Sequence, residues 1–239
     1  MQTRKAQYLK GMKDGIPIGL GYFAVSITLG IVAKEAGFSP LQAMLTSFLI
    51  NASAGEFVGF TLIAANCGYL ELIIMEAVAN IRYLLMSCSL SQKLPPETSM
   101  LHRMLIGFDV TDEIFGISIA VPDKLSPFYS YGAMSVAIPG WAIGTFIGTV
   151  LGNVLPLRAV SAMSVGLYGM FIAIFIPPAR KNKVIAGLVI ISFAASFLFT
   201  NIALFAQISA GMKTIILTVA ISLAAAILFP IKEESENDA

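Results

Sequence analysis

Residues 41–66 read LQAMLTSFLINASAGEFVGFTLIAAN, an apolar run interrupted near its centre by small and polar residues. A helix needs about 20 mainly apolar residues to cross a bilayer, so this run is long enough to be a membrane span. Its centre, residues 51–57, combines an amide, a hydroxyl, a glycine and a carboxylate. We therefore expect a membrane-spanning segment whose helix is broken at mid-membrane.

The composition of the whole chain agrees with a membrane protein. Of 239 residues, 57% are hydrophobic and 12% are charged, against about 25% charged in an average globular chain, and the mean hydropathy is +0.83. We expect an all-α fold, a polytopic transmembrane helical bundle. Charged and proline-containing breaks divide it into about eight spans, at residues 15–33, 41–66, 69–91, 103–121, 132–153, 160–176, 184–206 and 214–230.

The connectors between these spans are short, so we expect a single transmembrane domain over residues 1–239. Residues 1–14 are a basic N-terminal segment and residues 231–239 an acidic tail. With the N-terminus inside, nine Lys and Arg residues fall on the cytoplasmic side and five outside, when Arg82 is omitted because it lies within a span. Cytoplasmic connectors are enriched in these residues. We therefore expect a multi-pass protein of the cell (inner) membrane with both termini in the cytoplasm.

Two patterns concern how the spans pack. Residues 17–30 and 139–152 share a proline and a Leu-Gly pair at the same spacing, a weak internal repeat of the kind found in transporters. The second of these stretches also carries glycines at four-residue intervals, which line one face of a helix and let another backbone approach closely. The partner is another span of this chain or a separate subunit, and the spacing fits either. The glycines are Gly140, Gly144, Gly148 and Gly152.

The broken second span is a candidate substrate site. An ionised side chain at mid-bilayer costs at least about 2.5 kcal/mol, so the carboxylate of Glu56 indicates a function. A break also exposes backbone carbonyls and a half-helix N-terminus, whose positive dipole end suits an anionic substrate group. We expect Asn51, Ser53, Gly55 and Glu56 to bind substrate. The alternative is close helix packing by small residues, with Glu56 bonded to a neighbour.

The third span carries Glu76, Asn80 and Tyr83 on one helix face, while Arg82 points away from that face. Arg82 therefore needs a partner from another helix. Either an ion pair joins two helices, or the guanidinium binds a substrate carboxylate through two hydrogen bonds. We include Asn80, Arg82 and Tyr83 among the substrate-binding candidates.

The fourth span has too many acids to face lipid. Asp109, Asp112, Glu113 and Gly116 follow i, i+3, i+4, i+7 spacing, so a continuous helix would present one acidic stripe to water, substrate or a cationic partner. Three carboxylates this close cannot all ionise freely, so at least one is expected to carry a proton. The alternative is a helix that lies at the membrane surface. With Glu56, these three acids are our proton-coupling candidates.

Catalytic and metal chemistry have little support. Cys67 and Cys88 form no Cys-x-x-Cys pair, and the chain has one histidine, so we expect no metal site and no cofactor. The sequence has no His-Glu-x-x-His and no Gly-x-Ser-x-Gly pattern, which argues against an intramembrane hydrolase. We therefore expect that the protein is not an enzyme. Two functions remain as alternatives to a carrier: a passive channel for small solutes and a non-transporting partner subunit.

Three of these stretches resemble the AzlC family, the large subunit of branched-chain amino acid exporters. Ala54-Gly55-Glu56-Phe57 is similar to the family's small-residue Gln-Phe stretch, Asn80-Ile81-Arg82-Tyr83 to its Asn-x-Arg-His, and Thr111-Asp112-Glu113 to its Thr-Asp-Glu. The chain departs from that pattern at Glu56 and Tyr83. The resemblance runs over most of the chain. It implies a permease that exports branched-chain and other apolar amino acids with a small AzlD-like membrane subunit.

These expectations combine into one predicted site. Glu56, Asn80 and Arg82 would meet the three acids of the fourth span at mid-membrane, around a zwitterionic amino acid. Arg82 would hold the α-carboxylate, while Asp112 or Glu113 would take the ammonium group, or a proton once the substrate has left.

Overall fold

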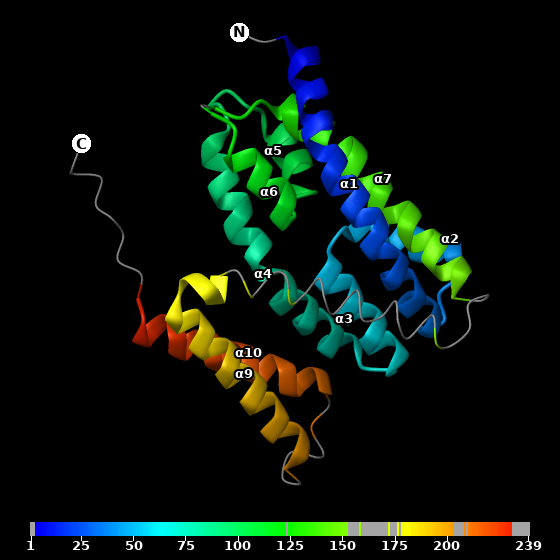
Figure 1. Ribbon diagram of the computed structural model, residues 1–239, viewed down its shortest axis with the longest axis vertical. Helices are drawn as coiled ribbons and strands as arrows, with labels where there is room; N and C mark the ends of the chain where they lie inside the picture. Colours follow the sequence, from blue (N-terminus) through cyan, green and yellow to red (C-terminus); the bar gives the residue numbers. More distant parts are fainter. Residues whose placement is uncertain are drawn as a thin grey trace. The chain divides into compact units, whose positions relative to one another are not determined.

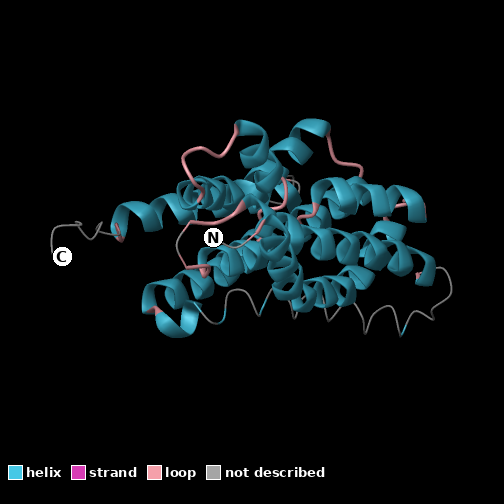
Figure 2. Cartoon of the chain, turned by 90° about the horizontal axis from the view of Figure 1, so that it is seen from above, coloured by secondary structure: helices cyan, strands magenta, loops and turns pink. Residues whose placement is uncertain are grey.

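The computed structural model describes residues 3–122, 124–152, 158, 172, 176, 178–202, 208 and 210–230. These residues form helices joined by loops and turns, with no strand among them (Figure 2). The chain divides into two compact units, one made of Met1–Gly68 with Ala79–Tyr168 and the other of Tyr69–Val78 with Gly169–Ala239. The prediction of a single transmembrane domain concerns both units together and stays a prediction.

Four helices of the described part are long and apolar enough to cross a membrane by length and composition: α1 (Arg4–Glu35), α4 (Tyr69–Lys93), α7 (Pro127–Leu151) and α9 (Lys183–Asn201). Four of the predicted spans match these helices, and α10 (Ala210–Leu228) matches the last one. Helix α1 begins at Arg4, so most of the basic N-terminal segment is helical. Predicted span 160–176 and the tail 231–239 lie outside the described residues, apart from residues 172 and 176.

Helices α1 and α7 run side by side in the same direction (Figure 1). Their contact begins where Gly11 of α1 lies on the backbone of Tyr129 and continues to Gly30, which lies on Gly148 and Thr145. A methyl group built on Gly148 would lie 1.9 Å from the carbonyl oxygen of Ile27, so only glycine fits there. The two stretches of the weak repeat, 17–30 and 139–152, therefore lie in neighbouring helices.

The predicted second span is two short helices, α2 (Pro40–Ile50) and α3 (Ser53–Ala64). Ser39 and Gln42 form a capping box that starts α2, and Asn51 ends it in the left-handed conformation, with φ 45°. The ring of Phe38, before α2, packs edge-on against Phe60 of α3 at 4.9 Å. The chain therefore turns back at Asn51, and residues 40–64 form a helical hairpin, here called hairpin A.

The predicted fourth span also divides in two, into α5 (Met100–Gly107) and α6 (Asp112–Ile119). Ser99 caps α5 and Thr111 caps α6 through their hydroxyl groups. Residues 100–119 are here called hairpin B. Because Asp109 precedes the cap of α6, the predicted single-helix stripe from Asp109 to Gly116 does not form.

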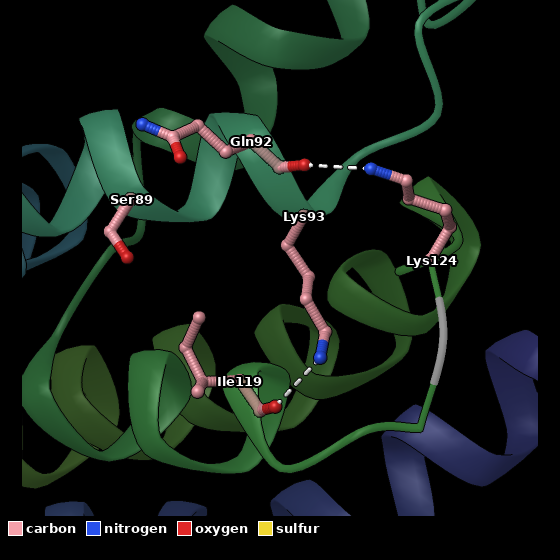
Figure 3. Close-up of a pocket in the computed structure, with 5 residues that line it drawn as sticks. All are labelled: Ser89, Gln92, Lys93, Ile119 and Lys124. Atoms are coloured by element: carbon pink, nitrogen blue, oxygen red, sulfur yellow. Dashed lines mark hydrogen bonds between the residues drawn. The ribbon is translucent and has the colours of Figure 1, made fainter. Parts of the chain in front are cut away.

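Both ends of hairpin B lie at the C-terminal end of α4. Arg103 donates 2.9 Å to the carbonyl of Ser91, and Lys93 donates 3.0 Å to the carbonyl of Ile119. Figure 3 shows the second contact, with Lys124 reaching back to the carbonyl of Gln92 at 3.1 Å. The chain therefore enters and leaves hairpin B at the same end of α4.

The two hairpins start from opposite ends of the α1–α7 pair. The base of hairpin A packs with Leu29 and Ala33, near the C-terminal end of α1. At the base of hairpin B, Nδ1 of His102 in α5 lies 2.6 Å from the hydroxyl of Tyr131, near the N-terminal end of α7. Their turns therefore point toward each other, where an uninterrupted eight-span bundle would have two continuous helices. In the second unit, α9 and α10 pack on each other.

Candidate functional site

The turns of the two hairpins meet beside the middle of α1 and α7. Asn51, at the turn of hairpin A, donates a side-chain hydrogen bond to Asp109, at the turn of hairpin B. Both side chains are buried, with 4% and 1% of their surface exposed. Asn51 Oδ1 and Asp109 Oδ2 have no hydrogen-bond partner among the described residues. The junction, here the contact between the two hairpin turns, is therefore a buried polar contact with two acceptor oxygens that have no donor among the described residues.

Glu56, in the first turn of α3, fixes hairpin A to α7. Its carboxylate accepts hydrogen bonds from Trp141 Nε1 at 2.7 Å, from the hydroxyl of Ser47 and from the backbone N–H of Ala52 at 3.2 Å. The Ser47 hydroxyl also lies 2.8 Å from that of Thr145 in α7. Glu56 is 1% exposed, so three donors surround a carboxylate that water does not reach.

Tyr22 of α1 holds the start of α6 in the same way. Its hydroxyl lies 2.6 Å from the hydroxyl of Thr111 and 2.6 Å from a carboxylate oxygen of Glu113. The Tyr22 ring also packs edge-on against Trp141, with centroids 5.4 Å apart. Tyr22 of α1 therefore holds hairpin B, Trp141 of α7 holds hairpin A, and the two aromatic rings are in contact. The helices α1 and α7 are here called the scaffold helices.

Arg82 of α4 pairs with the same end of α6. Its Nη1 lies 2.8 Å from Asp112 Oδ2, and its Nη2 donates to the hydroxyl of Tyr83 at 3.3 Å. Both charged side chains keep about a third of their surface exposed, 33% and 36%. The ion pair therefore borders accessible space, unlike Glu56 and Asp109.

The structure brings some of the predicted site residues into contact with one another, while others contact different residues. Arg82 meets Asp112, and Asn51 meets Asp109, whereas the contacts of Glu56 described above go to hairpin A and α7. Asn80 lies in α4, two residues before Arg82, while Ser53 and Gly55 lie in the first turn of α3. That turn has no side-chain cap. The predicted glycine series faces α1, with Gly140, Gly144 and Gly148 pressed against its backbone and Gly152 in ordinary contact with Lys34.

Sequence reasoning missed the residues that hold the hairpins. These are Tyr22, Ser47, Thr111, Trp141 and Thr145, of which the sequence analysis noted only Thr111, as part of a motif. Trp141 offered one signal, because it is the only tryptophan in the sequence and stands inside the glycine series. A buried tryptophan needs an acceptor for its N–H, and a buried carboxylate needs donors, so the two were candidates for each other.

Comparison with known protein families gives a match that covers this region. The model of the family described as AzlC protein matches residues 17–155, which include both hairpins, all of α7 and the part of α1 from residue 17 onward. The chain belongs to the AzlC family. This confirms the resemblance that the sequence motifs indicated.

Several relatives are membrane proteins by name. An uncharacterized membrane protein of Archaeoglobus fulgidus is 27% identical over 88% of this chain and 93% of its own. The inner membrane protein YgaZ of Escherichia coli is 28% identical over 71% of each chain. The branched-chain amino acid transport protein AzlC of Bacillus subtilis is 24% identical over 70% of this chain and 66% of its own. No solved structure matches the chain.

Proposed function

We propose that this AzlC-family protein is a permease, not an enzyme, that exports branched-chain and other apolar amino acids with proton coupling. The observation that carries the proposal is the meeting of two oppositely directed hairpins at Asn51 and Asp109. In transporters, broken helices place dipole ends and backbone groups at mid-membrane, where substrates and coupling ions bind. The name of the Bacillus subtilis relative, branched-chain amino acid transport protein, supports the substrate class.

The charges around the junction fit a zwitterionic substrate. The uncapped N-terminus of α3 offers backbone N–H groups at Ser53, Ala54 and Gly55 for an α-carboxylate, and Arg82 offers a guanidinium. The carboxylates of hairpin B, Asp109, Asp112 and Glu113, are the acceptors for an ammonium group or a proton. Each buried methylene adds only about 0.8 kcal/mol, so selectivity among branched apolar side chains would be loose.

The hairpins also change the expected path through the membrane in a way that the charges support. If hairpins A and B return to the side they entered from, the chain crosses six times, with span 160–176 included, and both termini stay cytoplasmic. Lys93 and Arg103 then move to the cytoplasmic side, and the count of Lys and Arg becomes eleven inside against three outside, where eight full crossings give nine against five. The positive-inside rule therefore favours re-entrant hairpins.

We further propose a small AzlD-like membrane subunit as partner. Helix α9 has no buried residue within the described part of the chain, and an apolar surface of this kind fits a partner helix in the membrane. A passive channel, or a subunit that does not itself transport, is the alternative function, and the polar junction alone fits either.

Transport by the purified protein tests the proposal. The chain, alone and with a candidate small subunit, would be reconstituted in liposomes loaded with unlabelled leucine, and uptake of labelled leucine would be measured with and without a pH gradient. A carrier gives saturable counterflow that exceeds equilibrium, and proton coupling makes accumulation depend on the gradient. Leucine flux that never saturates would identify a channel, and no flux in any combination would contradict the transport function.

A further inference from the structure

We propose that Asn51 and Asp109 form a binding site for a small monovalent cationic group where the two hairpin turns meet. This inference rests on the proposed transport function for its biological role, but it is argued from the junction itself. The group is either the ammonium of the substrate or a free inorganic cation, because the same oxygens would recognise both.

The first argument is that Asp109 has no positive partner among the described residues. Asp109 forms no ion pair with any described residue, and Arg82 is already engaged with Asp112. A carboxyl group that is 1% exposed either carries a proton and is neutral, or keeps its charge only beside a cation or strong hydrogen-bond donors. Asn51 supplies one hydrogen bond to Asp109 Oδ1, which leaves Oδ2 without a partner.

The second argument is the amide oxygen of Asn51. This atom is also buried and without a partner, and its side chain lies against Asp109. A carboxylate that only carried a proton would explain one vacant acceptor. Two vacant oxygens on one hydrogen-bonded pair of side chains are better explained by a donor or cation that binds at this pair.

The third argument comes from the helix ends. Asn51 is the C-cap residue of α2, and Asp109 directly follows Phe108, the C-cap residue of α5. The C-terminal end of a helix carries partial negative charge and carbonyl groups without intrahelical partners. Asn51 and Asp109 lie at these two C-terminal ends, where a positive group is favoured, while the N-termini of α3 and α6, which favour a negative group, follow them in the chain.

The chemistry of the site limits the charge of its ligand. One carboxylate balances one positive charge, and no cluster of three or more His, Cys, Asp or Glu side chains suited to a metal ion occurs in the described part of the chain. Divalent calcium sites need six to eight oxygens with several carboxylates. A primary ammonium or an ion such as sodium matches one carboxylate and an amide oxygen.

The placement also explains how one substrate could use both hairpins. Asn51 is followed by Ala52, the N-cap of α3, so the cation site and the uncapped N-terminus of α3 are adjacent in the chain. An amino acid whose ammonium is bound by the vacant oxygens of Asn51 and Asp109 would have its carboxylate near those N–H groups. Its binding would then link the two hairpin turns.

The test uses Trp141, the only tryptophan in the sequence, as a reporter, because its N–H contacts Glu56 of hairpin A. Fluorescence and thermal unfolding of the purified full chain would be followed during titration with sodium chloride, with N-methylglucamine chloride at equal ionic strength as control. Separate titrations would use 3-methylbutylamine, which has no carboxylate, and 4-methylpentanoate, which has no ammonium. The variants are Asp109→Asn, Asn51→Gly and, as control, Glu35→Gln, which neutralises an exposed acid at the end of α1.

Sodium or the amine should give a saturable signal in the original protein and in Glu35→Gln, and Asp109→Asn should weaken it at least tenfold. A sodium signal identifies a free coupling cation, and an amine signal without a sodium signal identifies the substrate ammonium. Asn51→Gly keeps a residue suited to positive φ and should weaken the same signal, which preserves the test if Asp109→Asn does not fold.

If neither sodium nor the amine gives a signal that depends on Asp109, the carboxyl group carries only a proton and the proposal is wrong. Failure of leucine transport with an intact cation signal would instead contradict the proposed function and leave the site in place.

Discussion

Trp141 of α7 donates a hydrogen bond of 2.7 Å to Glu56 of hairpin A, and this contact joins the scaffold helix α7 to α3, the second helix of the hairpin. Trp141 is 2% exposed and Glu56 1% exposed, so the bond forms away from water. The glycine series holds α7 in close backbone contact with α1, so this pair of helices sets the position of Glu56 and, with it, the start of α3.

We predict that the carboxylate of Glu56 matters to stability through its acceptor oxygens. Glu56→Gln keeps an acceptor for Trp141 and Ala52, whereas Glu56→Ala leaves buried donors unsatisfied, at about 1–3 kcal/mol for each. Glu56→Ala should therefore lower the unfolding temperature well below that of Glu56→Gln. Thermal unfolding of the two purified variants checks this. Equal temperatures would show that the contacts of Glu56 do not stabilise hairpin A.

We predict that Gly148→Ala disrupts the α1–α7 contact, although alanine is the better helix former. The added methyl group would lie 1.9 Å from the Ile27 carbonyl oxygen, a contact that only separation of the helices can relieve. The matched control is Gly21→Ala in α1, where no atom lies within 4 Å of the new methyl group. There alanine should be neutral, or stabilise by up to about 1 kcal/mol. Similar yields and unfolding temperatures for both variants would contradict the tight contact.

We predict that the two hairpins are re-entrant, which thiol labelling of intact cells can check. Cys67 follows hairpin A, so it would be extracellular in this topology and cytoplasmic in one with eight full crossings. A cysteine placed at Glu97, between α4 and α5, would show the reverse. A membrane-impermeant thiol reagent should label Cys67 in a Cys88→Ser background. It should spare Glu97→Cys in a background without Cys67 and Cys88. The opposite pattern would restore the eight crossings.

The break of the second span could be predicted, and that of the fourth could not, for a reason visible in the residues. Residues 51–57 combine small and polar side chains that leave no continuous apolar helix. In the fourth span the acids at 109, 112 and 113 also satisfy helical spacing, so the pattern predicts a stripe on one continuous helix. Thr111 followed by two acids is equally a helix start, because the hydroxyl caps Ile114 and the acids complement the helix dipole. The second interpretation is correct.

The partners of the site residues were less predictable than the residues themselves. Periodicity showed that Arg82 needs a partner from another helix, and the structure supplies Asp112. It could not show that Tyr22 would reach Glu113, or Trp141 Glu56, because these pairs are separated by 91 and 85 residues and meet through the packing of α1 on α7. The glycine spacing predicted a close contact without naming the helix, which only the three-dimensional arrangement provides.

The last prediction concerns the ion pair between Arg82 and Asp112, whose atoms lie 2.8 Å apart and whose side chains remain about one-third exposed. If Arg82 binds the substrate carboxylate, Arg82→Lys keeps the charge but loses the planar pair of donors and should weaken leucine binding about tenfold, the equivalent of one charge-assisted hydrogen bond. Asp112→Asn removes the carboxylate that competes for the guanidinium, so leucine binding should persist or strengthen. Proton-driven accumulation should be lost, while exchange should remain.

Binding, counterflow and the pH dependence of accumulation would be measured in liposomes, with Glu97→Gln as a control that neutralises an exposed acid beyond α4. Wild-type affinity and pH dependence in both folded variants would mean that Arg82 and Asp112 only join α4 to hairpin B, and that the substrate carboxylate is held by the N-terminus of α3 alone.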